Sequence, residues 1–320
     1  MVLYIVFIII GFFLLIKGAD YLVDGASGIA KKFNIPTIII GLTIVAIGTS
    51  MPELMVSTTA AIEGHSDMSI GNVVGSNIAN LFLILGICSV IKGLKFQKET
   101  EKIENFVTIF ATILLVIFGN NMNNNIITRT EGVVFLICCV LFILYNIFMA
   151  KKRKADTLLE IDSPDTNNQS VAKSILGIII GIVALKLGGD IVVKYASQIA
   201  EAMGLSEKII SITVIAFSTS LPELITSINA TIKGETDMAI GNILGSQIFN
   251  IFLIIGMSAL LCPINYSFEY NIDMCFLSFG TILFALFPFI GKKHYMTRSN
   301  GIIFIAIYVI YLTYSIVKVL

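Results

Sequence analysis

Two glutamates lie where a charged side chain is costly. Glu53 and Glu223 each follow a proline inside a long apolar stretch, in the motifs G-T-S-M-P-E (48–53) and S-T-S-L-P-E (218–223). A charge at the centre of a bilayer costs about 2.5–3.5 kcal/mol on insertion scales, so two of them require compensation. No Lys or Arg lies between residues 35 and 62 or between 209 and 232. The sequence therefore predicts a mobile cation as the partner of both carboxylates.

The prolines of these motifs predict broken helices. Pro52 and Pro222 lack an N–H and clash with the carbonyl four residues earlier, so each helix should break there. Ser50 to Glu53 also fits an S-x-x-E capping box. A simpler interpretation is a pair of kinked helices with local caps, but a cap contributes only about 1 kcal/mol. The freed carbonyls, which a cation could satisfy, belong to Gly48, Thr49, Ser218 and Thr219.

The following apolar stretch of each half adds a polar stripe. The segments are G-N-V-V-G-S-N-I-A-N (71–80) and G-N-I-L-G-S-Q-I-F-N (241–250), each with a G-x-x-x-G spacing for close helix approach. Hydroxyl and amide side chains every four residues share one helix face. They could act as glue between helices, but with the carboxylates they form an oxygen donor set typical of Ca²⁺, Na⁺ or Mg²⁺ sites. The stripes consist of Asn72, Ser76 and Asn80, and of Asn242, Ser246 and Asn250.

The composition places these residues in lipid. The chain has 320 residues, of which 56% are hydrophobic and 13% charged, against about 25% charged in soluble domains. Zero net charge disfavours nucleic acid, and the lack of a G-x-x-x-x-G-K-[ST] motif disfavours a nucleotide. The five cysteines have no C-x-x-C spacing and are read as small hydrophobes. We expect a transporter that uses an ion gradient, without a cofactor.

Ten membrane-spanning helices are expected at about 20 apolar residues each. The N-terminal apolar block has no preceding basic segment or following cleavage site, so it is read as the first span. The first and sixth spans are long, which indicates tilt or extension into the interface. The spans are 2–30, 35–62, 68–91, 104–120, 127–149, 173–201, 207–232, 238–261, 271–290 and 300–318.

Basic residues orient the spans. With the N-terminus outside, nearly all Lys and Arg fall in cytoplasmic connections, as the positive-inside rule requires. Both termini are therefore expected outside a multi-pass cell-membrane protein. The polar segment 150–172 should be a short cytoplasmic linker between a first unit at 1–149 and a second at 173–320.

The two units are repeats. A shift of 170 residues aligns 45–86 with 215–256 without a gap, and more than half of the positions are identical. Because five spans is an odd number, the second unit enters the membrane from the opposite side. The predicted fold is an all-α integral membrane protein of two inverted five-helix repeats, with broken second and seventh helices at its centre. Such transporters bind their substrate near the midplane, on interrupted helices of both repeats.

At the G-T-S-M-P-E and S-T-S-L-P-E motifs the sequence resembles the sodium/calcium exchanger family of the cation/calcium antiporters. The resemblance covers the whole chain and implies exchange of Na⁺ for Ca²⁺ in one central cavity, usually three Na⁺ for each Ca²⁺. It also implies carboxylate ligands shared by both ions, Thr carbonyls for Ca²⁺, and Ala carbonyls with Ser hydroxyls for Na⁺. These residues are Glu53, Glu223, Thr49, Thr219, Ala46, Ala216, Ser50, Ser220, Ser76 and Ser246, with Asn80 and Asn250 lining the middle. Several members carry Asp where this chain has Asn250, notably those that co-transport K⁺, so K⁺ dependence is not expected.

The remaining charges are given local roles. Lys186, Asp190 and Lys194 lie four residues apart and Lys17 lies three before Asp20, spacings that allow ion pairs along one helix. Asp24 has no assigned role.

The expected mechanism is alternating access in a functional monomer, with spans 1 and 6 sliding across the other eight. The expected cargo is Ca²⁺ exchanged for Na⁺, with electrogenic Ca²⁺ extrusion. Three alternatives stay open: an H⁺/Ca²⁺ (or other divalent cation) exchanger on the same glutamates, a passive cation channel, and an intramembrane aspartyl protease. The protease would use Asp20 and Asp190, but they lie in KGAD and LGGD, not in the G-x-G-D motif of such enzymes.

Overall fold

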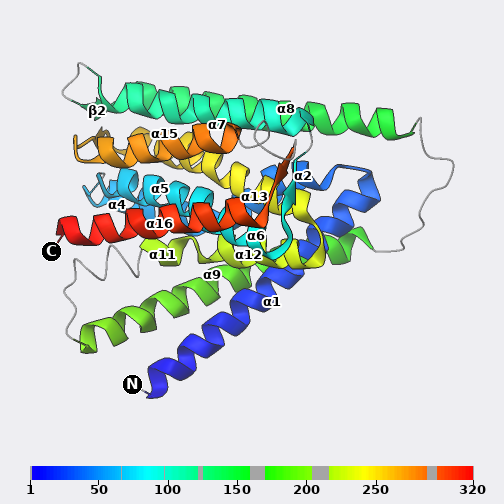
Figure 1. Ribbon diagram of the computed structural model, residues 1–320, viewed down its shortest axis with the longest axis horizontal. Coiled ribbons are helices and arrows are strands. Elements are labelled where there is room, and N and C mark those ends of the chain that lie inside the picture. The colour runs from blue at the N-terminus through cyan, green and yellow to red at the C-terminus, as the bar shows by residue number, and fades with distance from the viewer. Residues whose placement is uncertain are drawn as a thin grey trace.

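The protein is almost entirely helical in the computed structural model, which describes residues 2–65, 67–96, 98–121, 125–158, 170–203, 216–286 and 294–319. Four two-residue strands join the helices at their ends (Figure 1). The first half contains α1 (Val2–Phe33), α2 (Thr37–Ile40), η1 (Gly41–Val45), α3 (Ala46–Thr49), α4 (Met51–Ile62), α5 (Asp67–Ile78), η2 (Ala79–Ile84), α6 (Leu85–Lys92), β1 (Leu94–Lys95), α7 (Lys98–Gly119), β2 (Ile126–Ile127) and α8 (Arg129–Leu158). The second contains α9 (Val171–Ala202), α11 (Ala216–Thr219), α12 (Leu221–Lys233), α13 (Thr236–Phe249), η4 (Asn250–Ile255), α14 (Gly256–Leu261), β3 (Ile264–Asn265), α15 (Tyr270–Leu286), β4 (Tyr295–Met296) and α16 (Arg298–Val319).

The described residues contain six helices that are long and apolar enough to cross a membrane. A seventh candidate, Thr37–Thr49 with Met51–Ile62, is a pair bent by 46°. Two shorter apolar helices, Ile103–Gly119 and Tyr270–Leu286, coincide with expected spans. The six are Val2–Phe33, Met68–Lys92, Arg129–Lys152, Val171–Ala202, Thr236–Leu261 and Arg298–Val317. The structure thus confirms an all-helical, multi-spanning protein, whereas the count of ten stays a prediction.

Some expected boundaries lie outside the described residues. The first part of the expected span 207–232 is among them, and the span continues as α11 and α12. Residues 159–169 of the expected linker 150–172 are also outside, while α8 extends into the linker as far as Leu158 and α9 begins at Val171. The first and sixth helices, α1 and α9, have 32 residues each, which confirms their predicted length.

Helices α1 and α9 form an antiparallel pair along one edge of the molecule, inclined to α8 on the opposite edge (Figure 1). Glycines make their contact. A Cβ atom on Gly181 would lie 2.7 Å from the Gly18 carbonyl oxygen, and one on Gly188 would lie 2.7 Å from that of Gly11. The two backbones therefore touch directly, as small residues permit between helices in lipid.

The centre of the molecule joins the two halves. Helix α13 packs against α2, η1 and α3 of the first half. A Cβ atom on Gly245 would lie 2.8 Å from the Leu42 carbonyl oxygen, so the predicted G-x-x-x-G surface on this helix is confirmed. Of the six spans, Thr236–Leu261 is the most buried, with 83% of its apolar window inside the protein. The polar stripe of this helix therefore lies in the interior.

Short antiparallel strands link the helix ends. β1 pairs with β4, and β2 pairs with β3. Each pair joins a connection in the first half to one in the second. The strand pairs therefore hold the ends of α7, α8, α15 and α16 close to one another.

The glycine contact between α1 and α9 predicts unequal effects for one substitution at two sites. Gly181→Ala places a methyl group against the α1 backbone and should destabilise the protein by about 1–3 kcal/mol, as overpacking does. Gly189→Ala is the matched control, because the nearest atom to its Cβ would be Pro222 Cγ at 3.9 Å. Thermal unfolding in nanodiscs measures both. Equal midpoints for the two variants would contradict direct backbone contact at Gly181.

Candidate functional site

Each half of the chain contains a helix broken at a serine. The first break lies between α3 and α4 at Ser50 (φ −82°, ψ 7°), and the second between α11 and α12 at Ser220 (φ −84°, ψ 2°). Ser50 N–H still donates to the Ala46 carbonyl (3.0 Å), and Leu54 N–H donates to that of Ser50 (3.1 Å). The prolines are in the first turn of α4 and α12. Their missing N–H groups explain why the break falls there.

The predicted capping box at Ser50 is wrong. The Ser50 side chain makes no capping bond to its own helix. Its hydroxyl donates instead to Glu223 Oε1 of the other half, at 3.0 Å. Pro52 lacks one of the backbone N–H groups that a capping side chain would bind. The Ser50 hydroxyl donates its proton to the buried carboxylate of Glu223 instead, because a carboxylate is a strong acceptor. This hydrogen bond joins the two broken helices directly.

The two glutamates are buried in the same interior. Glu53 and Glu223 each have 1% exposed surface, and they are close enough to interact through their charges. Oε2 of each carboxylate is buried without a hydrogen-bond partner in the described structure. Buried carboxylates that keep their charge need counter-charge or further donors. The unpartnered oxygens are therefore available to a cation.

A chain of hydrogen bonds runs from the first broken helix into the second half. Thr49 Oγ1 donates to Asn242 Oδ1 at 3.1 Å, and Asn242 Nδ2 donates to Ser227 Oγ at 2.9 Å. All three side chains are buried, with no exposed surface. Asn242 therefore fixes the Thr49 side chain beside the helix break.

The same chain recurs with the halves exchanged. Thr219 Oγ1 donates to Asn72 Oδ1 at 3.3 Å, and Asn72 Nδ2 donates to Ser57 Oγ at 2.9 Å. The sequence indicated Asn72 as part of a polar stripe but did not indicate Ser57. A usable signal existed, because Ser57 lies one helical turn after Glu53 and recurs as a serine 170 residues later.

The other predicted site residues lie in the same interior. Ser76 and Thr219 place their hydroxyl oxygens 3.5 Å apart. Ser220 Oγ and Ser246 Oγ are buried without a partner in the described structure. The Ala46 carbonyl oxygen lies within hydrogen-bond distance of both the Ser50 backbone N–H and the Thr49 hydroxyl. Its counterpart in the second half, Ala216, is the first residue of α11. The structure thus gathers hydroxyl, carboxylate and carbonyl oxygens around the two breaks.

Asn80 and Asn250 lie in π-helical turns, which the sequence did not predict. Asn80 is in η2 and Asn250 begins η4. Such turns are rare and are frequent at functional sites. Both amide atoms of Asn80 and Oδ1 of Asn250 are buried without partners in the described residues. The wider turn therefore leaves amide groups in the interior that are free to bind.

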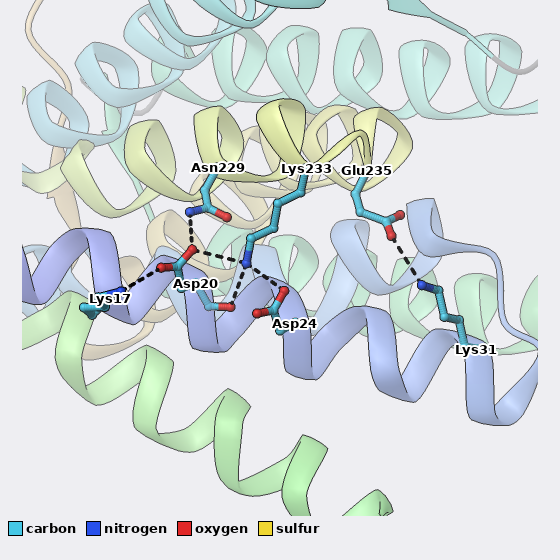
Figure 2. Close-up of polar contacts among 7 residues, drawn as sticks. All are labelled: Lys17, Asp20, Asp24, Lys31, Asn229, Lys233 and Glu235. Atoms are coloured by element: carbon cyan, nitrogen blue, oxygen red, sulfur yellow. Dashed lines mark hydrogen bonds and ion pairs between the residues drawn. The ribbon is translucent and has the colours of Figure 1, made fainter. Parts of the chain in front are cut away.

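A charged cluster joins α1 to α12, and the sequence missed it (Figure 2). Lys233 Nζ lies 2.7 Å from Asp24 Oδ1 and 3.2 Å from Asp20 Oδ1, while Asn229 Nδ2 donates to Asp20 Oδ1 at 2.8 Å. The predicted pair of Lys17 and Asp20 is confirmed at 3.5 Å. Asp24, which had no assigned role, thus binds a lysine more than 200 residues away in the chain.

The aspartates of the protease hypothesis have other partners. Asp20 belongs to the charged cluster. Asp190 is 54% exposed at its side chain and pairs with Lys186 at 2.7 Å, as the sequence predicted. In the described structure, Asp20 and Asp190 are not hydrogen-bonded to each other.

Broken helices from two halves that meet at buried carboxylates define a secondary transporter. The model of the sodium/calcium exchanger protein family matches residues 3–148 and 173–317. The chain is 32% identical to the sodium/calcium exchanger MaX1 of Methanosarcina acetivorans, across 95% of this chain and 96% of that protein. It is 33% identical to the inner membrane protein YrbG of Escherichia coli, across 87% and 86%.

Solved structures agree with this assignment. A structure of the sodium-calcium exchanger NCX_Mj has a TM-score of 0.84 to this chain at 31% identity, and the match covers 98% of both chains. The chain belongs to the sodium/calcium exchanger family. It is therefore a membrane antiporter of a transporter family and not an enzyme, and the protease hypothesis is wrong.

The crossed hydrogen bonds predict that the central asparagines stabilise the protein. Asn242→Leu removes the amide that accepts from Thr49 and donates to Ser227 and should cost about 1–3 kcal/mol, because buried hydrogen bonds are lost. Asn72→Leu should act similarly on Thr219 and Ser57. Asn120→Leu is the control, because its amide bonds are exposed. Unfolding midpoints of all three measure this, and a loss at Asn120 as large as at Asn242 would count against the buried chains.

Proposed function

We propose that this protein is an antiporter that exchanges Na⁺ for Ca²⁺ across the cell membrane. The observation that carries the proposal is the pair of buried carboxylates, Glu53 and Glu223, one from each half and each with an oxygen that no described residue hydrogen-bonds. Two carboxylates carry a charge of −2, which one Ca²⁺ balances. The membership of the family and the names of MaX1 and NCX_Mj support the same pair of ions.

The proposed topology has ten spans in two inverted repeats. Residues 1–149 form the first repeat, 150–172 the cytoplasmic linker and 173–320 the second repeat. The glycine pairs support this, because Gly11–Gly188 becomes Gly181–Gly18 when each residue is shifted by 170. Both chain ends also lie toward the left of Figure 1, whereas α8 ends at the right. With the basic connections inside, both termini would be extracellular.

The proposed ligands are all oxygen atoms. Carboxylate, hydroxyl, carbonyl and amide oxygens suit the hard ions Ca²⁺ and Na⁺. The carboxylates would be shared between the two ions, which makes their binding mutually exclusive and couples their movements. The ligands are Glu53, Glu223, Thr49, Thr219, Ala46, Ala216, Ser50, Ser220, Ser76, Ser246, Asn80 and Asn250.

Access to this buried site requires a movement. We assign it to α1 and α9, which contact each other closely through glycines and would slide together across the other helices. The charged cluster on Lys233 holds α1 against the C-terminal end of α12, whereas Glu223 lies in the first turn of that helix. If three Na⁺ enter for each Ca²⁺ that leaves, one net charge crosses per cycle, and about 2.3 kcal/mol per 100 mV of membrane potential drives Ca²⁺ extrusion. One monomer would suffice for the cycle.

The rival within this family is H⁺/Ca²⁺ exchange on the same glutamates. Oε2 of Glu53 and Oε2 of Glu223, both buried without partners, could carry protons as well as bind cations. The driving ion therefore decides between the two functions.

Flux assays test the proposal. Purified protein in sodium-loaded vesicles should take up ⁴⁵Ca²⁺ when external sodium is low, and a pH gradient alone should not drive uptake. Glu53→Gln and Glu223→Gln should each reduce uptake at least about 100-fold, since even changes around a metal ligand cost 10–100-fold. Glu104→Gln is the matched control, a buried glutamate on α7 outside the site. Uptake driven only by pH, or untouched by both site variants, would refute sodium/calcium exchange here.

A further inference from the structure

A chain of buried amides crosses between the halves beside the proposed site. Asn77 on α5 donates from Nδ2 to the Gln247 backbone carbonyl at 3.2 Å. Asn250 in turn donates from Nδ2 to Asn77 Oδ1 at 2.9 Å. Both asparagines are 1% exposed. This series of amide hydrogen bonds is not repeated with the halves exchanged. Asn80 is the repeat equivalent of Asn250, and both of its amide atoms are unpartnered in the described structure.

The direction of this chain is fixed by chemistry. A backbone carbonyl can only accept a hydrogen bond, so Asn77 must present its NH₂ group to Gln247. Its oxygen then faces Asn250, which must present its own NH₂ group in return. The Asn250 oxygen is then buried and accepts no hydrogen bond from the part of the chain that the structure describes. An amide oxygen is a Ca²⁺ ligand and an amide NH₂ group is not, so the orientation decides whether Asn250 can bind a cation.

We infer that Asn77 is a positioning residue that holds the Asn250 amide with its oxygen free for the transported cation. This rests on the proposed function, since it specifies how one proposed ligand is oriented. Without Asn77 the amide can turn and offer NH₂ to the cation. Supporting groups of this kind change metal affinity by about 10–100-fold.

A double-mutant cycle on the full chain tests this. The Ca²⁺ concentration that half-saturates the Ca²⁺-induced rise in thermal unfolding midpoint is measured for Asn77→Leu, Asn250→Ala and both together. Asn77→Leu should raise it about tenfold in the native background and leave it unchanged in the Asn250→Ala background. Asn146→Leu, another buried asparagine that donates to a backbone carbonyl, is the control and should have no effect.

The outcomes separate the two claims. If Asn77→Leu has the same effect in both backgrounds, or none, Asn77 does not act through Asn250 and the inference fails. If Ca²⁺ does not shift the midpoint of the native protein, the proposed function itself fails.

The charged cluster of Figure 2 carries a second, independent inference, because the described residues show an ion pair between α1 and α12 but none between α9 and α4. A shift of 170 residues turns Asp24 of α1 into Lys194 of α9, and Lys233 of α12 into Glu63 at the end of α4. The equivalent positions therefore also carry opposite charges, with the signs exchanged.

The second member of the cluster is matched as well. Asp20 corresponds to Asp190, and its hydrogen-bond donor Asn229 corresponds to Thr59, whose hydroxyl can also donate. Thr59, Glu63 and Lys194 are exposed. Asp190 pairs instead with Lys186 on its own helix. Lys194 lies over the ring of its neighbour Tyr195, with Nζ 5.6 Å from the ring centroid. Among the described residues, these complementary groups therefore make no ion pair between α9 and α4 in this conformation.

We propose that Glu63 and Lys194 form an ion pair in the opposite conformation of the transporter, in which the Asp24–Lys233 pair is broken. This rests on the proposed function and its inverted topology, in which exchanging the two halves exchanges the two states, so α9 would meet α4 in one state as α1 meets α12 in the other. Each state would then be closed at one end by its own ion pair. An exposed pair changes such an equilibrium by about two- to fivefold.

Charge exchange and cross-linking test this pair. Glu63→Lys and Lys194→Glu should each lower the transport rate about two- to fivefold, and the double exchange should restore it. In a chain whose five native cysteines are replaced, a cysteine pair at 63 and 194 should form a disulfide that stops transport until it is reduced. A pair at 24 and 233 is the positive control.

Two results would overturn the proposal. One is a double exchange no faster than the single variants. The other is a cysteine pair at 63 and 194 that never cross-links while the control pair does. The cross-link is read on gels, so it is independent of which ion drives transport.

Discussion

The structure depends on two carboxylates enclosed in one apolar interior. Glu53 and Glu223 are each 1% exposed, and the hydroxyl that donates to Glu223 comes from Ser50 of the opposite half. Charges in such surroundings persist only with opposite charge or several donors nearby. The broken helices, the crossed Thr–Asn–Ser chains and the glycine contacts that bring α13 onto η1 all serve this need. The site is therefore a property of both halves together and of neither half alone.

The two halves share some of the contacts around the site, whereas the ion pairs between α1 and α12 occur in one arrangement only. The chains through Asn72 and Asn242 exchange with each other when the halves are exchanged. The charged cluster around Lys233 does not. An ion-binding site can be symmetric between the two halves. A conformation that is open to only one side of the membrane cannot be, because the two halves must then be arranged differently. The charged cluster around Lys233 is thus the contact that we expect to differ between the two states.

The sequence predicted what depends on short-range chemistry. Proline at 52 and 222 placed the breaks, apolar length gave the long spans, and the repeat identified the glutamates. The sequence did not predict hydrogen-bond and ion-pair partners that come together only through packing between distant segments. Ser50 suited a local cap but binds Glu223, and Asp24 had no visible partner because Lys233 is brought to it only by the contact of α12 with α1. The π-helical turns at Asn80 and Asn250 likewise depend on how the helices pack.

The composition of the proposed ligand set bears on which ion can drive Ca²⁺. Of its twelve residues, only Glu53 and Glu223 have a carboxylate that can take up a proton; Asn250 has none, unlike an aspartate in its place. Protons could therefore replace at most the two charges of one Ca²⁺, which is an electrically neutral exchange. Sodium is not limited in this way, because neutral hydroxyl, amide and carbonyl oxygens also bind it. Only with sodium can more positive charge enter than leaves with Ca²⁺, so that extrusion draws on the membrane potential.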